Sequence, residues 1–276
     1  VERAGIPFVG VPAGKLRRYL SLRNAADVFK VLAGFFASRR ALRRLKPALL
    51  FSKVCFVSVP PCAAAASLGI PVFTHESDYS PGLATRINLR FAERVFTAYG
   101  DTIRSLPPAC RSKAAVAGNP VRAEFRTADP ERGRRFLGLG PRERILLVLG
   151  GSQGARQVNE LVAAALDRLC EEYVVVHQTG REAEGIPAPS ERYRPYEYIR
   201  DELPDVLAAA ELVVGRSGAG TVWEAAVAGL PMVLIPLAGS GTRGDQVENA
   251  EHFRLSGAAE VLIGENARHD ILAEAV

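Results

Sequence analysis

The sequence predicts an α/β protein of two doubly wound, Rossmann-like domains, each built on a parallel sheet, that face a shared cleft. At 276 residues, the chain fits two domains of roughly 100 to 150 residues each. Short apolar runs alternate with helical patterns along almost the whole chain, which is typical of parallel sheets with crossover helices. Two of the turns from strand to helix are rich in glycine. In such sheets, ligands bind beyond the carboxyl ends of the strands.

Short apolar runs mark the expected strands. They are Phe8–Val11, Leu49–Ser52, Val72–Thr74, Val95–Thr97, Ala115–Ala117, Ile145–Leu149, Val174–His177, Tyr196–Ile199, Leu212–Gly215, Met232–Pro236 and Glu260–Ile263. We expect the domain break after Arg122, because residues 124–144 are charged, contain two prolines and include no strong strand. The expected domains are therefore residues 1–122 and residues 123–276.

Two glycine-rich turns indicate where a ligand binds. Gly150-Gly151-Ser152-Gln153-Gly154-Ala155 follows a strand and precedes a helical pattern, and Ser217-Gly218-Ala219-Gly220-Thr221 does the same. Such turns aim backbone N–H groups at one point, which suits a phosphate. The alternative is that the glycines only turn the chain tightly onto a packed helix. Two such turns in one half of the chain favour a phosphorylated ligand.

Composition narrows the class of protein. The content of 48% hydrophobic and 24% charged residues is ordinary for a globular protein, and no apolar run reaches the roughly 18 residues of a membrane span. The four cysteines form no C-x-x-C pair and have no histidine at metal-ligand spacing, so we expect no zinc, no disulfide framework and a reducing compartment. The first residues are not typical of a signal peptide. Because they lack an initiator Met, we expect the chain to begin inside a longer protein.

Charge is divided unequally between the two halves. Residues 1–122 carry 19 Lys and Arg against 6 Asp and Glu, whereas residues 123–276 carry 16 against 24. Most of the excess lies in a basic block from Lys15 to Lys53, which contains a helical pattern that ends before Pro47. Either its cations are solvated while an apolar stripe packs on a sheet, or Phe35, Phe36 and nearby cations lie against an anionic membrane. Nucleic acid is not expected, because stacking platforms and a recognisable binding module are absent.

Five motifs then occur in the order and spacing of one family. They are His75-Glu76-Ser77-Asp78 with Pro81-Gly82-Leu83-Ala84, Gly118-Asn119-Pro120-Val121-Arg122, Gly150–Ala155, Ser217-Gly218-Ala219 with Glu224, and Asp245-Gln246 with Asn249. Over nearly its whole length, the chain resembles the MurG family of glycosyltransferases. The resemblance implies the GT-B fold, in which the second domain holds a nucleotide sugar and the first meets a lipid acceptor.

The resemblance also implies a reaction and a place in the cell. The family transfers N-acetylglucosamine from UDP-GlcNAc to lipid I, which is undecaprenyl-pyrophosphoryl-MurNAc-pentapeptide, and so makes lipid II for peptidoglycan, cell shape and cell division. The reaction takes place at the cytoplasmic face of the bacterial membrane, where the protein is peripheral. The basic block from Lys15 to Lys53 agrees with an anionic membrane surface as partner.

Binding roles carry over from the family to matching positions. For the diphosphate, the residues implied are Gly151, Ser152 and Gln153, with the amides of Ala219, Gly220 and Thr221. Glu224 would accept hydrogen bonds from the ribose hydroxyls, and Ile199 would lie against uracil and bond its edge through its backbone. Gln246 and Asn249 would reach the GlcNAc hydroxyls.

Arg122 and Asp78 would close the site from the first domain. Structural roles without ligand contact stay open: Glu224 as a solvated helix residue, Gln246 and Asn249 as caps of a loop, and Arg122 as a partner of Glu124 or a hinge contact. His75 is expected to be structural. His177, His252 and His269 show no constellation around them.

The departures from the family leave the catalytic residue unknown. The family's opening strand and glycine loop, with a histidine proposed for catalysis, are expected before Val1, so the first domain lacks them here. The family's closing helix is likewise expected after Val276. Val54-Cys55 replaces a second family glycine pair. Two other classes therefore stay open: a non-catalytic nucleotide-sugar-binding fragment or homologue, and a lipid glycosyltransferase with another acceptor.

No metal or cofactor is expected. The sequence has no D-x-D triad beside a strand end, and helix N-termini can stabilise the charge that grows on a departing diphosphate. The implied chemistry is an inverting displacement at the anomeric carbon of GlcNAc by the acceptor's 4-hydroxyl, with UDP as the leaving group.

Overall fold

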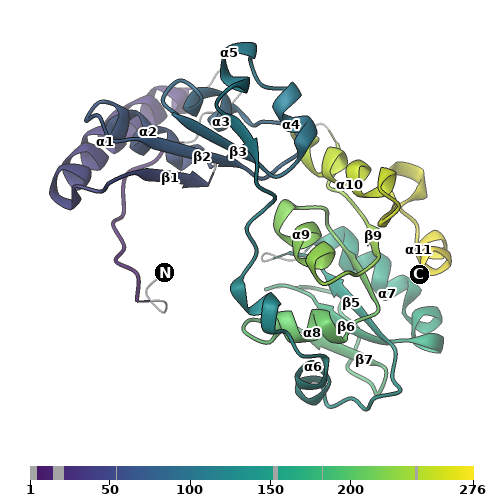
Figure 1. Ribbon diagram of the computed structural model, residues 1–276. Helices are drawn as coiled ribbons and strands as arrows, with labels where there is room; N and C mark the ends of the chain where they lie inside the picture. The colour runs from purple at the N-terminus through teal and green to yellow at the C-terminus, as the bar shows by residue number, and fades with distance from the viewer. Residues whose placement is uncertain (1–4, 15–21, 54, 152–154, 182, 240–241) are drawn as a thin grey trace. The chain divides into compact units, whose positions relative to one another are not determined.

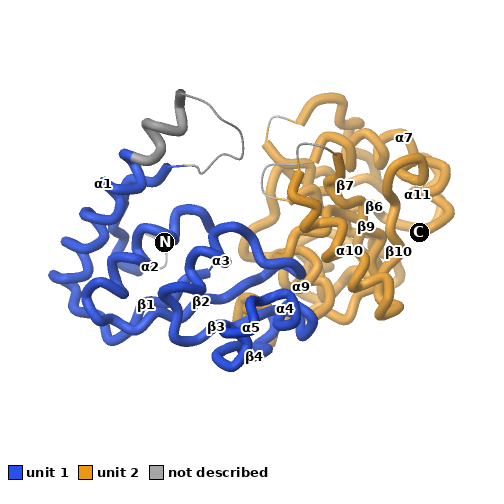
Figure 2. Tube along the Cα trace, turned by 90° about the horizontal axis from the view of Figure 1, so that it is seen from above, with its two compact units in different colours: residues 1–118 blue, residues 119–276 orange. Residues whose placement is uncertain are grey.

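The computed structural model describes residues 5–14, 22–53, 55–151, 155–181, 183–239 and 242–276 (Figure 1). The chain divides into two compact units, residues 1–118 and residues 119–276 (Figure 2). This division into compact units falls after Gly118, whereas the domain break after Arg122 stays a prediction. Each unit holds a parallel sheet with helices around it, so the prediction of two parallel-sheet α/β domains is confirmed.

Unit 1 is built on a four-stranded parallel sheet in the order β1-β2-β3-β4. The strands are β1 (Leu50–Lys53), β2 (Val72–Glu76), β3 (Arg94–Thr97) and β4 (Ala114–Val116). The helices are α1 (Leu22–Leu45), α2 (Val59–Ala66), α3 (Leu83–Asn88), α4 (Gly100–Arg104) and α5 (Pro108–Arg111), with a 3-10 turn at Phe56–Ser58. Helices α1 and α2 lie side by side on the same face of the sheet (Figure 1), and their buried Leu42, Cys62 and Ala65 pack with Val72 and Val95.

The expected strand at Phe8–Val11 is wrong. This segment has no strand pairing, and the Phe8 side chain is 67% exposed. Pro7 and Pro12 flank it, and a proline has no N–H to give to a ladder. The segment instead reaches α1 at Gly34, where a Cβ atom would lie 2.3 Å from the Pro12 carbonyl oxygen.

Unit 2 is built on a six-stranded parallel sheet in the order β10-β9-β8-β5-β6-β7. The strands are β5 (Ile145–Leu149), β6 (Val174–Gln178), β7 (Tyr193–Tyr196), β8 (Leu212–Gly215), β9 (Met232–Leu234) and β10 (Ala259–Val261). The helices are α6 (Pro130–Leu137), α7 (Arg156–Glu172), α8 (Leu203–Ala209), α9 (Ala219–Val227), α10 (Asp245–Leu255) and α11 (His269–Ala275), with 3-10 turns at Ala123–Thr127 and Gly264–Asn266. Helices α7 and α11 cover one face of this sheet, and α6, α8 and α9 lie on the other (Figure 1).

Strand β7 begins earlier than the sequence predicted, at Tyr193 rather than Tyr196. The Tyr193 side chain is buried in the core, and Tyr193 is the partner of Val175 in the pairing of β7 with β6. Pro195 is tolerated within β7 because this strand is at the edge of the sheet. The expected strand at Tyr196–Ile199 therefore overlaps β7 at one residue, and Ile199 lies in the segment that leads to α8.

The strand order of unit 2 places a topological switch point between β5 and β8. From β5 the chain moves outward to β6 and β7, and it then returns to the other side of β5 for β8, β9 and β10. The two connections leave the sheet in opposite directions, so a crevice opens beyond the carboxyl ends of β5 and β8. Both glycine-rich turns begin at these two strand ends.

Candidate functional site

On both sides of the switch point, the backbone conformation or a close backbone approach requires glycine. Gly151, after β5, has φ +86°, in the left-handed region that favours glycine. Gly215 ends β8, where an added Cβ atom would lie 2.5 Å from the carbonyl oxygen of Leu149 in β5. A side chain at position 215 would therefore force the two strands apart at the base of the crevice.

The N-terminus of α9 contributes backbone N–H groups that have no acceptor within the helix. Gly218 is its N-cap residue, and the first intrahelical bond runs from the Val222 N–H to the Gly218 carbonyl. The amides of Ala219, Gly220 and Thr221 precede that bond and have no intrahelical acceptor. A Cβ atom at Gly218 or Gly220 would meet nothing within 4 Å. The start of this helix therefore offers open space and N–H groups suited to an anion.

The two turns line one cavity of about 600 Å³ in unit 2. It lies between the ends of β5, β8 and β9 and the starts of α7, α9 and α10. Its lining residues are Gly150, Gly151, Ala155, Arg156, Gln157, Glu160, Arg216, Gly218, Thr221, Leu237 and Gln246. The structure thus brings together three residues that the sequence predicted for the site: Gly151, Thr221 and Gln246.

Arg216 is a cavity residue that sequence reasoning missed. Its Nη1 donates to the Gln157 Oε1 at 3.0 Å and to the Ile235 carbonyl at 2.9 Å. Burial lowers the pKa of this guanidinium below its ordinary value, but an arginine remains charged at neutral pH. The signal was an arginine directly after a buried strand and before Ser217-Gly218. A fixed cation beside two glycine turns strengthens the case for an anionic ligand.

Gln246 and Asn249, which the sequence predicted as a pair, have different positions. Gln246 lines the cavity, and its Oε1 accepts from the Leu237 N–H at 2.8 Å. Asn249 is fully buried, and its Nδ2 donates to the Ser217 carbonyl at 3.1 Å. The Ser217 hydroxyl in turn donates to the Gln246 carbonyl at 2.7 Å. Asn249 thus fixes the turn before α9 and supports the cavity wall from behind.

Glu224 and Ile199 are linked through Arg122. The Arg122 Nε lies 3.4 Å from the Glu224 Oε1, so Arg122 pairs with Glu224, where the sequence had left Glu124 as a possible partner. The Arg122 Nη1 donates to the carbonyl of Arg200 at 3.1 Å. Ile199 is buried, and its N–H donates to the Gln178 Oε1 at 2.9 Å. One arginine therefore connects α9 with the segment that carries Ile199.

Three of the remaining predicted residues are Ser152, Gln153 and Asp78. Ser152 and Gln153 fall outside the described residues, as does Val54. Asp78 belongs to unit 1, where its N–H donates to the Glu76 Oε1 at 3.0 Å. Glu76 is itself buried and also accepts from the Gly82 N–H and the Thr85 hydroxyl. This carboxylate therefore fixes the turn that carries Asp78.

Two buried histidines lie one residue before the ends of their strands. In unit 1, His75 Nε2 lies 2.8 Å from the Gly118 carbonyl, and burial lowers the pKa of His75. In unit 2, His177 lies within hydrogen-bond distance of Asn159 and Tyr193, two partners that the sequence did not indicate. Burial lowers the pKa of His177 to about 4. Its two partners lie on α7 and β7, and the sequence does not show that these elements meet at β6.

Two features are absent from the described residues. Within that part of the chain, no three His, Cys, Asp or Glu side chains gather closely enough to hold a metal ion. Nor is any helix in it long and apolar enough to cross a membrane.

Comparison with known proteins identifies the family. The family model of the glycosyltransferase family 28 C-terminal domain matches residues 145–276, and that of the N-terminal domain matches residues 1–97. A UDP-N-acetylglucosamine–N-acetylmuramyl-(pentapeptide) pyrophosphoryl-undecaprenol N-acetylglucosamine transferase of Treponema denticola is 51% identical over 96% of this chain and 71% of its own length. The transferase of the same name from Staphylococcus carnosus is 44% identical over 94% of this chain and 70% of its own.

A solved structure agrees with the fold. The crystal structure of Acinetobacter baumannii MurG superposes with a TM-score of 0.67 at 24% identity, covering 99% of this chain and 77% of that one. The two parallel-sheet units are therefore those of a GT-B protein, as the resemblance implied. The chain belongs to glycosyltransferase family 28 and is a glycosyltransferase of the MurG group.

Proposed function

We propose that this protein transfers N-acetylglucosamine from UDP-GlcNAc to lipid I, and that the cavity at the switch point of unit 2 holds the diphosphate of the donor. The observation that carries the proposal is the convergence on one cavity of Arg216 and two glycine turns, the second of which forms the N-terminus of α9. Each of these groups favours negative charge, and the diphosphate is the negative part of the donor.

The rest of the donor follows the carboxyl edge of the sheet. We assign the ribose hydroxyls to Glu224, one turn beyond Gly220 on α9, because a carboxylate accepts two hydrogen bonds. The uracil edge is assigned to the backbone of Ile199. The carbonyl of the next residue, Arg200, accepts from Arg122, which also pairs with Glu224. The GlcNAc hydroxyls are assigned to Gln246, whose side chain lines the cavity, with Asn249 supporting it.

The chemistry requires stabilisation of the leaving group. When the acceptor's 4-hydroxyl displaces UDP at the anomeric carbon, negative charge grows on the β-phosphate. The amides of Ala219, Gly220 and Thr221 and the guanidinium of Arg216 are fixed before the reaction, so they stabilise this charge without reorganising. The acceptor proton passes to a general base, for which we assign no residue.

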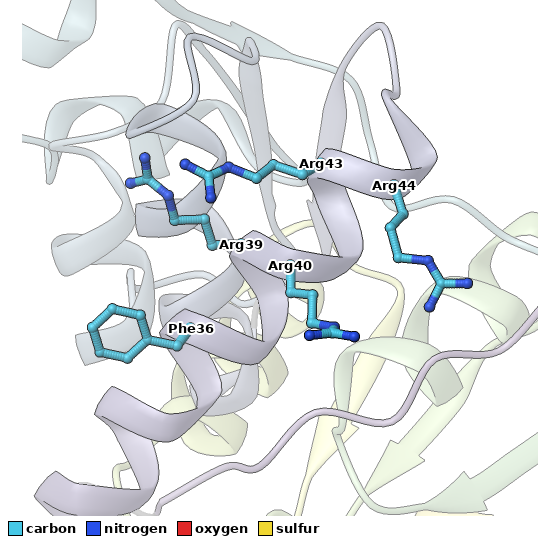
Figure 3. A pocket seen from close by; sticks show the side chains of 5 residues that line it. All are labelled: Phe36, Arg39, Arg40, Arg43 and Arg44. Carbon is cyan, nitrogen blue, oxygen red and sulfur yellow. The ribbon is translucent and has the colours of Figure 1, made fainter.

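An exposed stripe on α1 supports a membrane surface as partner. Phe29, Leu32 and Phe36 recur at helical spacing, and their side chains are 73%, 50% and 66% exposed. Helix α1 instead buries Ser38 and Leu42 on its other side. The exposed stripe continues toward the helix C-terminus as arginines, which line a hollow with Phe36 (Figure 3): Arg39, Arg40, Arg43 and Arg44.

Exposed apolar side chains beside arginines suit an anionic leaflet, because the rings enter the interface while the guanidinium groups meet the headgroups. This arrangement differs from a solvated outer face, on which the apolar side chains would be packed. We therefore propose that the protein is peripheral at the cytoplasmic face of the membrane. There it would serve peptidoglycan synthesis, and through it cell shape and division.

A transfer assay with labelled UDP-GlcNAc and lipid I tests the proposed reaction. The expected products are lipid II and UDP. Donor binding without transfer to any lipid would support the alternative of a nucleotide-sugar-binding homologue. Transfer to diacylglycerol but not to lipid I would support a glycosyltransferase with another acceptor.

A further inference from the structure

The carboxyl end of β6 carries two buried polar side chains that face opposite sides of the sheet. His177 and Gln178 are 0% and 4% exposed. Because neighbouring residues of a strand point to opposite faces, His177 faces α7 and Gln178 faces the segment that leads to α8. The proposed reaction uses neither side chain directly.

His177 is bonded to the first turn of α7. Its Nε2 lies 3.1 Å from the Asn159 Oδ1, and the Asn159 Nδ2 donates to the Thr179 carbonyl at 3.0 Å. Since Asn159 donates through its nitrogen, its oxygen accepts, and His177 Nε2 carries the proton. His177 Nδ1 then accepts from the Tyr193 hydroxyl at 2.9 Å.

This chain of hydrogen bonds runs in one direction through three elements. It starts at Tyr193 in β7, passes through His177 in β6 and Asn159 in α7, and ends at the carbonyl of Thr179, just after β6. The Asn159 N–H also bonds the Ala155 carbonyl, at the end of the glycine turn after β5. His177 therefore fixes the helix start that follows the proposed diphosphate turn.

Gln178 is bonded to the other half of the site. Its Oε1 accepts from the Ile199 N–H at 2.9 Å. The adjacent backbone is held as well, because the Thr179 N–H donates to the Tyr196 carbonyl and the Gly180 N–H donates to the Glu197 carbonyl. Gln178 therefore fixes the segment whose backbone is assigned to uracil.

We propose that His177 and Gln178 are positioning residues of the donor site, with separate tasks. His177 sets the diphosphate side through Asn159, and Gln178 sets the base side through Ile199. The inference rests on the proposed function, since it assigns tasks within the same donor site. It adds two residues that contact no part of the donor.

Nucleotide titrations separate the two tasks. The preference for UDP over UMP reports the diphosphate side, and the preference for UMP over CMP reports the base side. His177→Leu should lower the preference for UDP over UMP about tenfold, because the buried Asn159 Oδ1 on α7 loses its hydrogen-bond donor. It should leave the preference for UMP over CMP unchanged. Gln178→Leu should lower the preference for UMP over CMP about tenfold, because the Ile199 N–H loses its acceptor. It should leave the preference for UDP over UMP unchanged.

Conservative and control variants distinguish positioning from general loosening. His177→Gln retains a donor toward Asn159 and should restore much of the preference for UDP over UMP. Val162→Ala removes buried methyl groups from α7 away from these bonds, so it should lower stability while leaving both preferences unchanged. If His177→Leu does not fold, Tyr193→Phe, which deletes one hydroxyl, should lower the same preference by less.

Two outcomes would overturn the inference. One is that both preferences remain at the wild-type value in the folded His177 and Gln178 variants. The other is that both fall together in each variant and in Val162→Ala, which would mean general loosening. Failure of the wild-type protein to bind UDP would instead refute the proposed function, so the two failures are distinguishable.

Discussion

Acidification should destabilise unit 2 through His177. The neutral ring is buried between the Tyr193 hydroxyl and the Asn159 amide, and burial lowers its pKa from 6.5 to about 4. As the pH falls, the unfolded chain therefore takes up the proton before the folded chain does. The stabilisation is fully present above pH 6.5 and is lost as the pH falls from 6.5 toward 4.

The magnitude follows from the difference between the two pKa values. One pKa unit corresponds to about 1.4 kcal/mol, so the full effect approaches about 3 kcal/mol below pH 4. Between pH 7 and pH 5, where the folded chain stays neutral at this site, the loss is about 2 kcal/mol. For a domain of marginal stability this is a large fraction of the free energy of unfolding.

Urea unfolding at a series of pH values measures this loss. The sequence contains one tryptophan, Trp223 in α9, so its fluorescence follows unfolding of unit 2. The comparison is between wild type and His177→Gln, which cannot titrate. Carboxylates and His75 titrate in both proteins and cancel in the difference. Wild type should lose about 2 kcal/mol more than the variant between pH 7 and pH 5, and parallel curves would refute the reasoning.

Three further predictions concern backbone contacts and the α1 surface. Gly133→Ala should destabilise unit 2 by about 1 to 3 kcal/mol, because a Cβ atom would lie 2.2 Å from the Asp205 carbonyl oxygen in α8. Trp223 fluorescence measures the urea midpoint of unfolding, and an unchanged midpoint would contradict this contact. Gly215→Ala should weaken UDP-GlcNAc binding as well as stability, since it separates β5 from β8, and unchanged affinity would show that the crevice does not depend on this approach. Co-sedimentation with phosphatidylglycerol vesicles should fall with rising salt. It should also fall in the double variant Arg40→Glu and Arg44→Glu, with a loss of membrane-binding free energy of roughly 1 kcal/mol for each positive charge removed. Binding that does not change with salt would contradict an electrostatic membrane surface.

Local patterns could be predicted from the sequence. A strand, a glycine turn and a helix are consecutive in the chain, so the turns at Gly150 and Ser217 required no knowledge of the rest of the fold. Parallel pairing then followed from the alternation of strands and helices. The prediction of a strand at Phe8–Val11 was wrong because the flanking prolines have no N–H to give to a ladder.

Contacts between distant residues could not be predicted in this way. Arg216 depends on the carbonyl of Ile235, which strand order brings near it. The spacing between Gln246 and Asn249 does not show whether Asn249 faces the cavity or the core. In the structure, the Asn249 side chain is buried in the core. His177 has partners 16 and 18 residues away, on elements whose contact depends on the sheet.

Titration calorimetry with UDP-GlcNAc measures whether the switch-point cavity and Glu224 bind the donor. The protein should bind UDP-GlcNAc saturably, and Glu224→Ala should weaken the affinity at least about tenfold, because hydrogen bonds to a carboxylate are lost. Glu172→Ala is the matched control: it also removes a helix carboxylate from an arginine ion pair, that with Arg144, and should bind as wild type does. Absent binding, or equal affinity in wild type and Glu224→Ala, would contradict the account.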